Sequence, residues 1–304
     1  MSQYLFTFGL NEDGQCGISS GVKEDNEKAA NKNVYKPTVV PFFRSSGVSI
    51  RSVSVGSRHT LALSKTGEVY SWGWGHLGQL GHGDNLSQAN PRKINSISNV
   101  IFISAGGMHC GCITENNICY TWGACNYGQL GIGDSAINQD MISIPTEVKF
   151  DETTLCSKIT CGGLHTAAIT LDGSVYCWGK ADSGQTGCPD WYKTFFSGIY
   201  SPKKVYGFNG KAIDVACGGF HTLILTDDNS VYAMGKEDFG LLGTGNTGRN
   251  MSIGAEVPTL LQAFNGIKIT QLSAGGFDKS IFQFISENSH FFVEIFSKDG
   301  IVVL

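Results

Sequence analysis

The sequence has little proline, little charge and no excess of positive charge. Seven prolines stand among 304 residues, charged side chains make up 16% of the chain, and the formal net charge is -4. A protein that holds nucleic acid through its phosphates needs a basic surface, so this balance argues against direct nucleic-acid binding. The hydrophobic fraction of 41% is large enough for a folded core and excludes a largely disordered chain.

Targeting and membrane signals are also lacking. The first ten residues carry no positive charge ahead of their apolar side chains, unlike a secretory signal. No run reaches the ~20 apolar residues of a membrane helix, and the C-terminal IVVL lacks the cysteine that prenylation requires. Ten cysteines without a signal peptide or regular pairing predict reduced thiols in a cytosol-like compartment. We therefore expect a cytoplasmic protein, with the nucleus as an alternative.

Glycine is what the sequence has in excess. It holds 40 glycines, about twice the usual share of ~7%. With so few prolines beside them, these glycines indicate many tight turns rather than a flexible linker or a collagen. The composition predicts a turn-rich, all-β fold.

One unit recurs along the chain. The segment Val55–Asp84 is repeated in outline from Ala105, from Cys161 and from Cys217. A period of roughly 55 residues is the signature of a repeat architecture. Within each unit a partly alternating run such as HTLALS, a turn such as LDGS and an aromatic run such as VYSWG predict strand, hairpin turn and strand.

Two half-copies lie at the ends of the chain and complement each other. Residues 8–17 match the second half of the unit, and residues 274–278 match the first half. Five prolines open similar P-x-x-(V/I/L) segments and count the units independently: Pro37, Pro91, Pro145, Pro202 and Pro258. Units of this size suit blades of roughly four strands. The sequence therefore predicts a single β-propeller over residues 1–304 with five recognisable blades.

The half-copies also predict how the propeller closes. A strand over Tyr4–Gly9 would complete the blade begun by residues 275–285, which would remove two exposed sheet edges. Residues 286–304 are expected to form a C-terminal strand or tail. In an alternative arrangement, residues 290–293 occupy the slot of the N-terminal strand, and the N-terminal half-unit then belongs to an additional blade.

The repeated motifs resemble a known family. The pattern G-x-x-H-T, D-G-x-V-Y-x-W-G and G-Q-L-G is similar to that of the regulator of chromosome condensation repeat, from Tyr4 to about residue 285. The resemblance implies a β-propeller and distinguishes the chain from kelch-type propellers. Members of this family usually carry seven blades, so we expect between five and seven blades here.

The repeated histidines and tryptophans are expected to be structural. Four equivalent positions around a ring cannot converge on one metal ion or substrate, so each imidazole should form hydrogen bonds between strands or blades. The Trp-Gly pairs should fill the space between blades. These predicted structural residues are His59, His109, His165, His221, Trp72, Trp122 and Trp178.

Catalytic and metal-binding motifs do not occur. The sequence lacks G-x-S-x-G, H-E-x-x-H, a Walker loop and a Rossmann glycine pattern. Cys110 and Cys112 are two residues apart, without the C-x2-C spacing of a zinc site. We therefore predict no catalytic residue, no metal site and no cofactor.

Partner-binding residues are expected where the units differ. The residue before each landmark histidine, or at its position in the fifth copy, varies, and most of these residues are large and apolar: Arg58, Met108, Leu164, Phe220 and Phe277. Equivalent turns of a ring emerge on one face, so these side chains would form an apolar annulus with one arginine, which suits a protein-binding hot spot. The alternative is that they pack inward or plug the channel.

A linker rich in aromatic residues is the second candidate. The hypothesis places a partner contact at Asp190, Trp191, Tyr192, Lys193, Phe195 and Phe196, with Tyr200 close by. Tryptophan and tyrosine supply much of the binding energy at interface centres. The alternative is a satellite cluster that folds onto its own blade.

The family resemblance implies a function as well. Its best-known member catalyses nucleotide exchange on the small GTPase Ran through one propeller face and a wedge from a blade linker, and the aromatic linker resembles that wedge by position. The acidic residue that the exchange factor carries inside a G-x-x-H turn is missing, because Gly163 stands at the corresponding position. No basic tail of the kind used for chromatin contact precedes Tyr4.

Two hypotheses follow. The first is a regulator of a small GTPase of the Ran or Rab type, most simply a guanine-nucleotide exchange factor. The second is a non-catalytic scaffold or adaptor that uses the same face for another protein. The same repeat also occurs in effectors that intracellular bacteria inject into host cells, so a host GTPase in the host cytosol is a further alternative.

Overall fold

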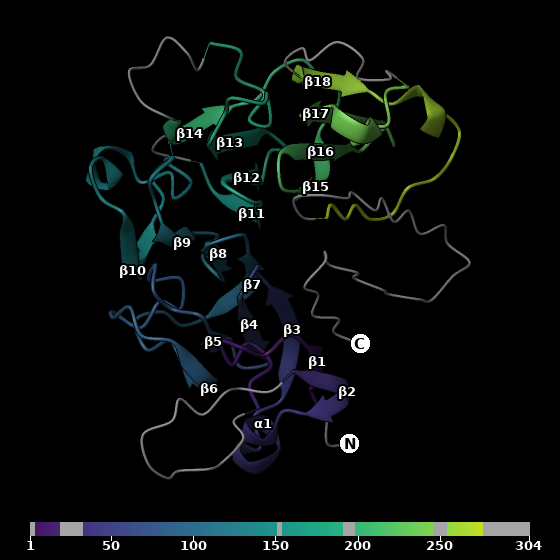
Figure 1. Ribbon diagram of the computed structural model, residues 1–304. Coiled ribbons are helices and arrows are strands. Elements are labelled where there is room, and N and C mark those ends of the chain that lie inside the picture. The colour runs from purple at the N-terminus through teal and green to yellow at the C-terminus, as the bar shows by residue number, and fades with distance from the viewer. Residues whose placement is uncertain (1–3, 19–32, 151–153, 191–197, 246–253, 276–304) are drawn as a thin grey trace.

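The fold is all-β, as the sequence predicts. The computed structural model describes residues 4–18, 33–150, 154–190, 198–245 and 254–275. This part forms four four-stranded antiparallel sheets and one two-stranded sheet. The one α-helix among these residues is α1 (Pro41–Ser46). Figure 1 shows the four large sheets following one another in an arc, as the blades of a propeller do.

Each of the four large sheets is one repeat unit with its strands in chain order. The first two sheets are β3 (Ile50–Val55), β4 (His59–Ser64), β5 (Val69–Gly73) and β6 (Gln88–Lys93), then β7 (Val100–Ala105), β8 (His109–Thr114), β9 (Cys119–Ala124) and β10 (Met141–Glu147). The next two are β11 (Cys156–Cys161), β12 (His165–Thr170), β13 (Val175–Gly179) and β14 (Ile199–Lys204), then β15 (Ala212–Cys217), β16 (His221–Thr226), β17 (Val231–Gly235) and β18 (Ala255–Leu260).

The order of the strands follows from their sequences. The second strands β4, β8, β12 and β16 are buried at every position, which fits their rows of small, apolar and hydroxyl side chains. The fourth strands β6, β10, β14 and β18 lie at the periphery (Figure 1) and each contains a proline. Proline cannot donate to a sheet ladder, so it is tolerated at such an edge and discourages pairing with another chain.

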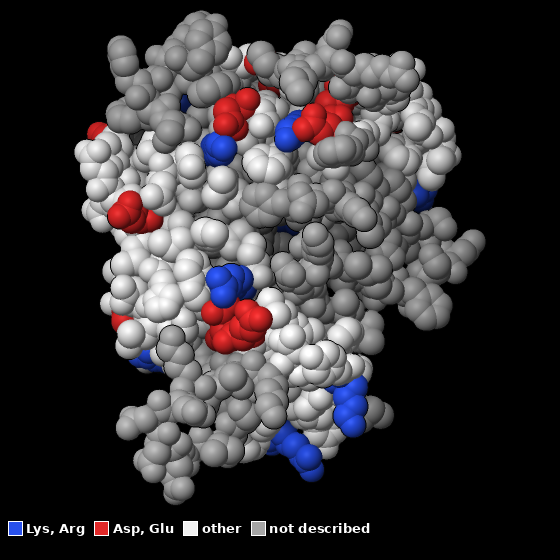
Figure 2. Space-filling view, in the orientation of Figure 1, with Lys and Arg blue, Asp and Glu red and all other residues white. Residues whose placement is uncertain are grey.

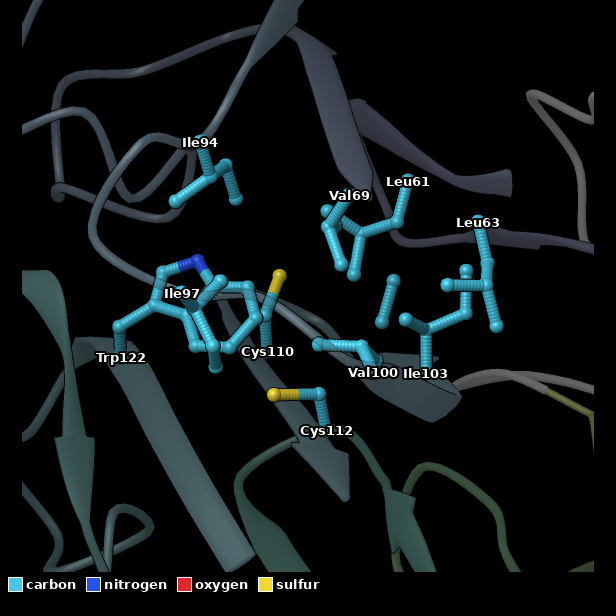
Figure 3. Packing of buried hydrophobic residues seen from close by; sticks show 11 residues of the cluster. Leu61, Leu63, Val69, Ile94, Ile97, Val100, Ile103, Cys110, Cys112 and Trp122 are labelled. Carbon is cyan, nitrogen blue, oxygen red and sulfur yellow. The ribbon is translucent and has the colours of Figure 1, made fainter. Parts of the chain in front are cut away.

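The hydrophobic core lies between neighbouring blades rather than inside one blade. One cluster joins Leu61 and Leu63 of β4 to Val100 and Ile103 of β7. Figure 3 shows these side chains meeting between the two sheets, with Trp122 beside them. Each blade is therefore stabilised by its neighbours, as is usual in repeat proteins.

The two ends of the chain contribute half-units. The N-terminal half-unit is a two-stranded sheet in which β1 (Phe6–Gly9) pairs with β2 (Val34–Val39). At the other end, Gly219 N donates to Gly275 O at 3.2 Å, so the fifth unit begins beside the fourth blade. Residues 276–304 lie outside the described part, so closure of the ring by the N-terminal strand and the tail over 286–304 stay predictions.

Candidate functional site

The landmark histidines connect each blade to the next. His109 Nε2 lies 2.8 Å from Thr166 Oγ1, and His165 Nε2 lies 2.9 Å from Thr222 Oγ1. Thr166 donates its hydroxyl proton to the carbonyl of Gln129 at 2.8 Å, so the imidazole N–H is the donor to this hydroxyl. Burial lowers the pKa of His109 and of His165 to about 3, so both rings are neutral near pH 7.

His59 makes the same contact with a cysteine in place of threonine. Its Nε2 lies 3.0 Å from Cys110 Sγ, and this thiol donates to the carbonyl of Gln79 at 3.3 Å. The pair has the residue types of a nucleophile and its base, but both side chains are completely buried. Burial raises the pKa of Cys110 well above its ordinary value and lowers that of His59 to about 4. A neutral, enclosed thiol and imidazole cannot form the reactive ion pair, so the contact is structural.

The tryptophans complete the contacts between blades. The indole N–H of Trp72 donates to Gln15 O at 2.8 Å, and that of Trp122 donates to Gln79 O at 2.9 Å. Trp178 donates to Gln129 O at 3.0 Å. The carbonyls of Gln15, Gln79 and Gln129 thus each accept from two side chains of the next blade, and that of Gln185 accepts from Thr222 at 2.8 Å. These contacts fix the blades relative to one another and hold their turns in place.

No cluster of metal ligands and no disulfide bond occurs in the described residues. They contain no group of three or more His, Cys, Asp or Glu side chains that could hold a metal ion. All ten cysteines are free thiols. Within the same residues, no helix is long and apolar enough to cross a membrane.

The G-x-x-H turns lie together at one end of the blades. The residue after each Trp-Gly or Met-Gly pair donates its backbone N–H to the residue before the histidine: Trp74 to Arg58, Ala124 to Met108, Lys180 to Leu164 and Lys236 to Phe220, each at 2.9 Å. The same contact in all four blades places these residues at equivalent positions. We call the end of the blades that contains these eight residues and their loop neighbours the turn face.

The turn face is less apolar than the annulus expected from sequence. Met108 is 39% exposed, whereas Leu164 and Phe220 are only partly exposed. Arg58 is exposed, lies over the Trp74 ring at 5.5 Å and forms an ion pair with Asp13 at 2.6 Å. An exposed arginine over a half-buried tryptophan, on a face that also exposes a methionine, is a combination of residue types that is enriched in protein interfaces.

Four residues of this face were not expected from the sequence. The side chain of Lys180 connects three blades, because its Nζ lies 5.2 Å from the Tyr127 ring and 6.0 Å from the Phe220 ring. Lys236 lies 5.5 Å from the same Phe220 ring. All four residues lie within the first four positions after the glycine of a Trp-Gly or Met-Gly pair, where the units differ in sequence: Trp74, Tyr127, Lys180 and Lys236. Comparing the residues after each Trp-Gly would therefore have found them.

Charge on this surface is arranged in neighbouring pairs. Figure 2 shows three places, over β4–β7, β13 and β17, where a blue patch touches a red patch, with uncharged surface between them. The ion pairs of the turn face include Arg58–Asp13, Lys180–Asp182 and Lys236–Asp238. The face thus combines uncharged surface with pairs of opposite charge.

The aromatic linker lies mostly outside the described residues. Trp191, Tyr192, Lys193, Phe195 and Phe196 are not described, and neither is Phe277 of the fifth turn. Of the described neighbours, Asp190 is exposed. Tyr200 lies in β14 and donates its hydroxyl proton to Asn126 O of the preceding blade at 2.9 Å, so it packs between blades. The partner contact at this linker stays a prediction.

Comparison with known proteins places the repeats in a family. The sequence model described as "Regulator of chromosome condensation (RCC1) repeat" matches five segments: residues 4–63, 66–113, 116–169, 172–225 and 228–277. A second model of the same description matches residues 50–79, 156–185 and 212–241. The five matches confirm the five units counted from the sequence.

Similar proteins match this chain over very different shares of their own length. The human E3 ubiquitin-protein ligase HERC2 is 32% identical over 272 residues, which cover 89% of this chain and 5% of that protein. The ultraviolet-B receptor UVR8 of Arabidopsis thaliana is 31% identical over 271 residues, 88% of this chain and 56% of the receptor. Yeast RCC1 (Prp20), solved bound to Kap60, superposes with a TM-score of 0.71 at 25% identity, covering 80% of this chain and 55% of that one. The chain thus spans at most 56% of these three proteins.

Proposed function

The chain belongs to the regulator of chromosome condensation (RCC1) repeat family, and on this premise we propose that it binds a protein partner through the turn face. The finer proposal is that the partner is a small GTPase of the Ran or Rab type and that binding regulates its nucleotide state. Named relatives include a ubiquitin ligase and a light receptor. What such different proteins can share is a binding scaffold rather than a chemical reaction.

One observation carries this proposal: the exposed Arg58 lies over the Trp74 ring, on a surface that also exposes Met108 and that the blade contacts hold in place. Arginine and tryptophan are enriched among residues that dominate binding energy. A surface fixed by buried hydrogen bonds loses little conformational entropy when a partner binds. The turn face therefore has both the composition and the rigidity of a binding site.

Nucleotide exchange needs no reactive group on the propeller. A protein that binds the nucleotide-free GTPase more tightly than the loaded form weakens nucleotide binding by the same factor, because the two equilibria are linked. The inert, buried Cys110 and His59 are compatible with such a function. A rigid face that selects one state of the GTPase is sufficient.

Release of a fluorescent GDP analogue tests the GTPase proposal. The full chain in excess is mixed with Ran- and Rab-type GTPases, and release is followed against spontaneous loss. We expect faster release from at least one GTPase and a loss of the effect in the double variant Arg58→Ala, Trp74→Ala. If no member of the panel responds to the wild-type chain, regulation by nucleotide exchange is excluded.

A second candidate function is a scaffold or adaptor without effect on nucleotide. The glycines of the G-x-x-H turns favour this function, because they leave no acidic side chain there. Gly163 supplies no carboxylate, and in the neighbouring turn a Cβ at Gly107 would lie 2.5 Å from Gly163 O, too close for a side chain. Capture of partners by the wild-type chain and by a Trp191→Ala, Phe195→Ala variant tests it. A folded double variant that captures every partner as well as wild type would remove the aromatic linker from the site.

The cysteines indicate a cellular compartment. The ten free thiols suit a reducing environment, so we propose the cytoplasm, with the nucleus or a host cytosol as alternatives. Fluorescence microscopy of the tagged full chain tests this placement. Accumulation in an oxidising compartment would contradict it.

A further inference from the structure

Neighbouring blades meet at one buried position that recurs at every interface between them. There, the first residue of a blade's third strand lies in the same hydrophobic cluster as an equivalent residue of the next unit. Three of the interfaces hold apolar pairs: Val69 with Val100, Val175 with Ala212, and Val231 with Ile269. The first of these pairs belongs to the cluster of Figure 3. Between the second and third blades, the pair is instead Cys119 and Cys156.

The backbone holds these two cysteines next to each other. Cys156 N donates to Asn117 O at 3.0 Å, and Cys119 follows this asparagine by two residues. The same bond recurs in the first interface, where Val100 N donates to Gly67 O at 3.0 Å. The side chains of Cys119 and Cys156 form a hydrogen bond with each other. The two thiols therefore meet across the interface between the blades.

Both thiols are enclosed but lie close to the surface. Cys119 is 2% exposed and Cys156 is 1% exposed. Burial raises the pKa of the Cys119 thiol well above its ordinary value, and the neighbouring Cys156 raises it further, so the reactive thiolate is scarce near pH 7. The adjoining residues are exposed, namely Leu155 before Cys156 and Glu115 in the hairpin turn before Cys119. A local opening of this turn is therefore enough to expose both thiols.

We propose that Cys119 and Cys156 are a modification site, at which a hydroperoxide oxidises the two thiols to a disulfide that links the second blade to the third. One sulfur attacks a peroxide oxygen, the O–O bond breaks, and a sulfenic acid and water form. The second sulfur then attacks the sulfenic sulfur, the S–O bond breaks, and a second water leaves. The thiols lose two electrons and two protons, and the peroxide is reduced to two waters.

The burial of the pair makes the reaction depend on the state of the interface. While the blades are closed, the thiols are neutral and shielded, so they stay reduced. Once the interface opens, oxidation can proceed, and the disulfide then constrains the chain between residues 119 and 156. The equivalent apolar pairs at the other three interfaces cannot be linked in this way. This inference does not depend on the proposed function, because it involves neither the turn face nor a partner.

Mapping of disulfides after peroxide treatment tests the proposal. The reduced full chain is treated with hydrogen peroxide, with and without urea below the unfolding transition. Free thiols are then blocked with N-ethylmaleimide, and linked peptides are identified by mass spectrometry. We expect Cys119–Cys156 to be the first and main disulfide, to form several-fold faster in urea, and to be reversed by dithiothreitol. Another pair that forms first, no disulfide at all, or a rate unchanged by urea would overturn the proposal.

Variants copied from the other interfaces test whether the disulfide holds the blades together. The double variant Cys119→Val, Cys156→Val reproduces the Val69–Val100 pair, so it should fold. Peroxide should raise the unfolding temperature of the wild type by several degrees and leave that of the double variant unchanged. The single variant Cys156→Ala, which copies Ala212 of the third interface, should behave like the double variant. An equal rise in these variants, or no rise in the linked wild type, would overturn the proposal.

A matched control removes a different buried thiol. Cys161→Val copies Val55 at the equivalent position of the first blade and keeps the pair intact. It should form the same disulfide as the wild type and show the same rise in unfolding temperature. Loss of the rise in this variant would place the oxidation at Cys161 and overturn the assignment.

Discussion

At the scale of single residues, the repeated histidines determine how the protein responds to pH. Burial lowers the pKa of His59 and His221 to about 4, and that of His109 and His165 to about 3. In the unfolded chain these groups titrate near 6.5. The stabilisation from keeping them neutral is therefore complete above pH 6.5 and is lost as pH falls toward 4 and 3.

This titration predicts a steep loss of stability in mild acid. At pH 5.5 each buried histidine costs about 1.4 kcal/mol, so the four together cost on the order of 5 kcal/mol relative to pH 7.5. Urea unfolding at both pH values measures the change. A His109→Gln variant, less stable at pH 7.5, should show a smaller pH dependence. Equal midpoints for the wild type at both pH values would contradict the neutral, buried state.

Cys110 is the second residue with a specific consequence. It replaces the threonine that accepts the histidine hydrogen bond in two other blades, so Cys110→Thr should keep both of its contacts. Cys110→Val has nearly the shape of threonine but leaves His59 Nε2 without an acceptor. The valine variant should be less stable than the threonine variant by about 1 to 3 kcal/mol. Thermal unfolding compares the two variants. Equal stability would contradict a stabilising hydrogen bond between His59 and residue 110.

At the scale of elements, the glycine loops decide how closely the blades approach. Gly78 has a φ of 69°, and a Cβ there would lie 2.8 Å from the Cα of Ser143 in β10 of the next blade. Gly47 has a φ of 70° after α1, and nothing lies within 4 Å of its Cβ position. A side chain would strain the backbone at both positions, because both have a positive φ. Only at Gly78 would it also collide with the next blade.

Alanine at these two glycines should therefore have different effects. Both variants should be destabilised, because alanine is strained in the left-handed backbone conformation. Gly78→Ala should lose a further 1 to 3 kcal/mol or so, because β10 must move away from the loop. Chemical denaturation of both variants gives the difference. Similar free energies of unfolding would mean that the loop and β10 are not held against each other.

The elements were the most predictable part of the molecule. Alternation, turn signals and the repeat together predicted β4, β5 and their equivalents, because each unit contains the same local information. The detailed contacts could not be predicted in this way. Nothing in the sequence says that Trp122 and Cys110 share the carbonyl of Gln79, since they come from different strands and a different blade. Likewise, Leu164 and Phe220 are partly covered by neighbouring blades, which no local pattern reports.

At the scale of the whole molecule, closure of the ring is still a prediction. The complementary half-units predict that Tyr4–Gly9 completes a blade with residues 275–285. A chain that ends at Gly275 should then exchange the backbone amides of β1 faster than the full chain, while β8 to β13 stay unchanged, because β1 would lose its second neighbour. Hydrogen exchange with mass spectrometry resolves both regions. Equal exchange at β1 in the two chains would contradict closure by this strand.

The central claim of the account is that partners bind the turn face and that no reactive group is involved. Hydrogen exchange of the full chain, with and without the nucleotide-free GTPase that responds in the release assay, tests it most directly. The account predicts slower exchange in the peptides that contain Arg58, Trp74 and Met108. Protection confined to the hairpin turns near Lys65, Glu115 and Asp172, at the opposite ends of the strands, would contradict it.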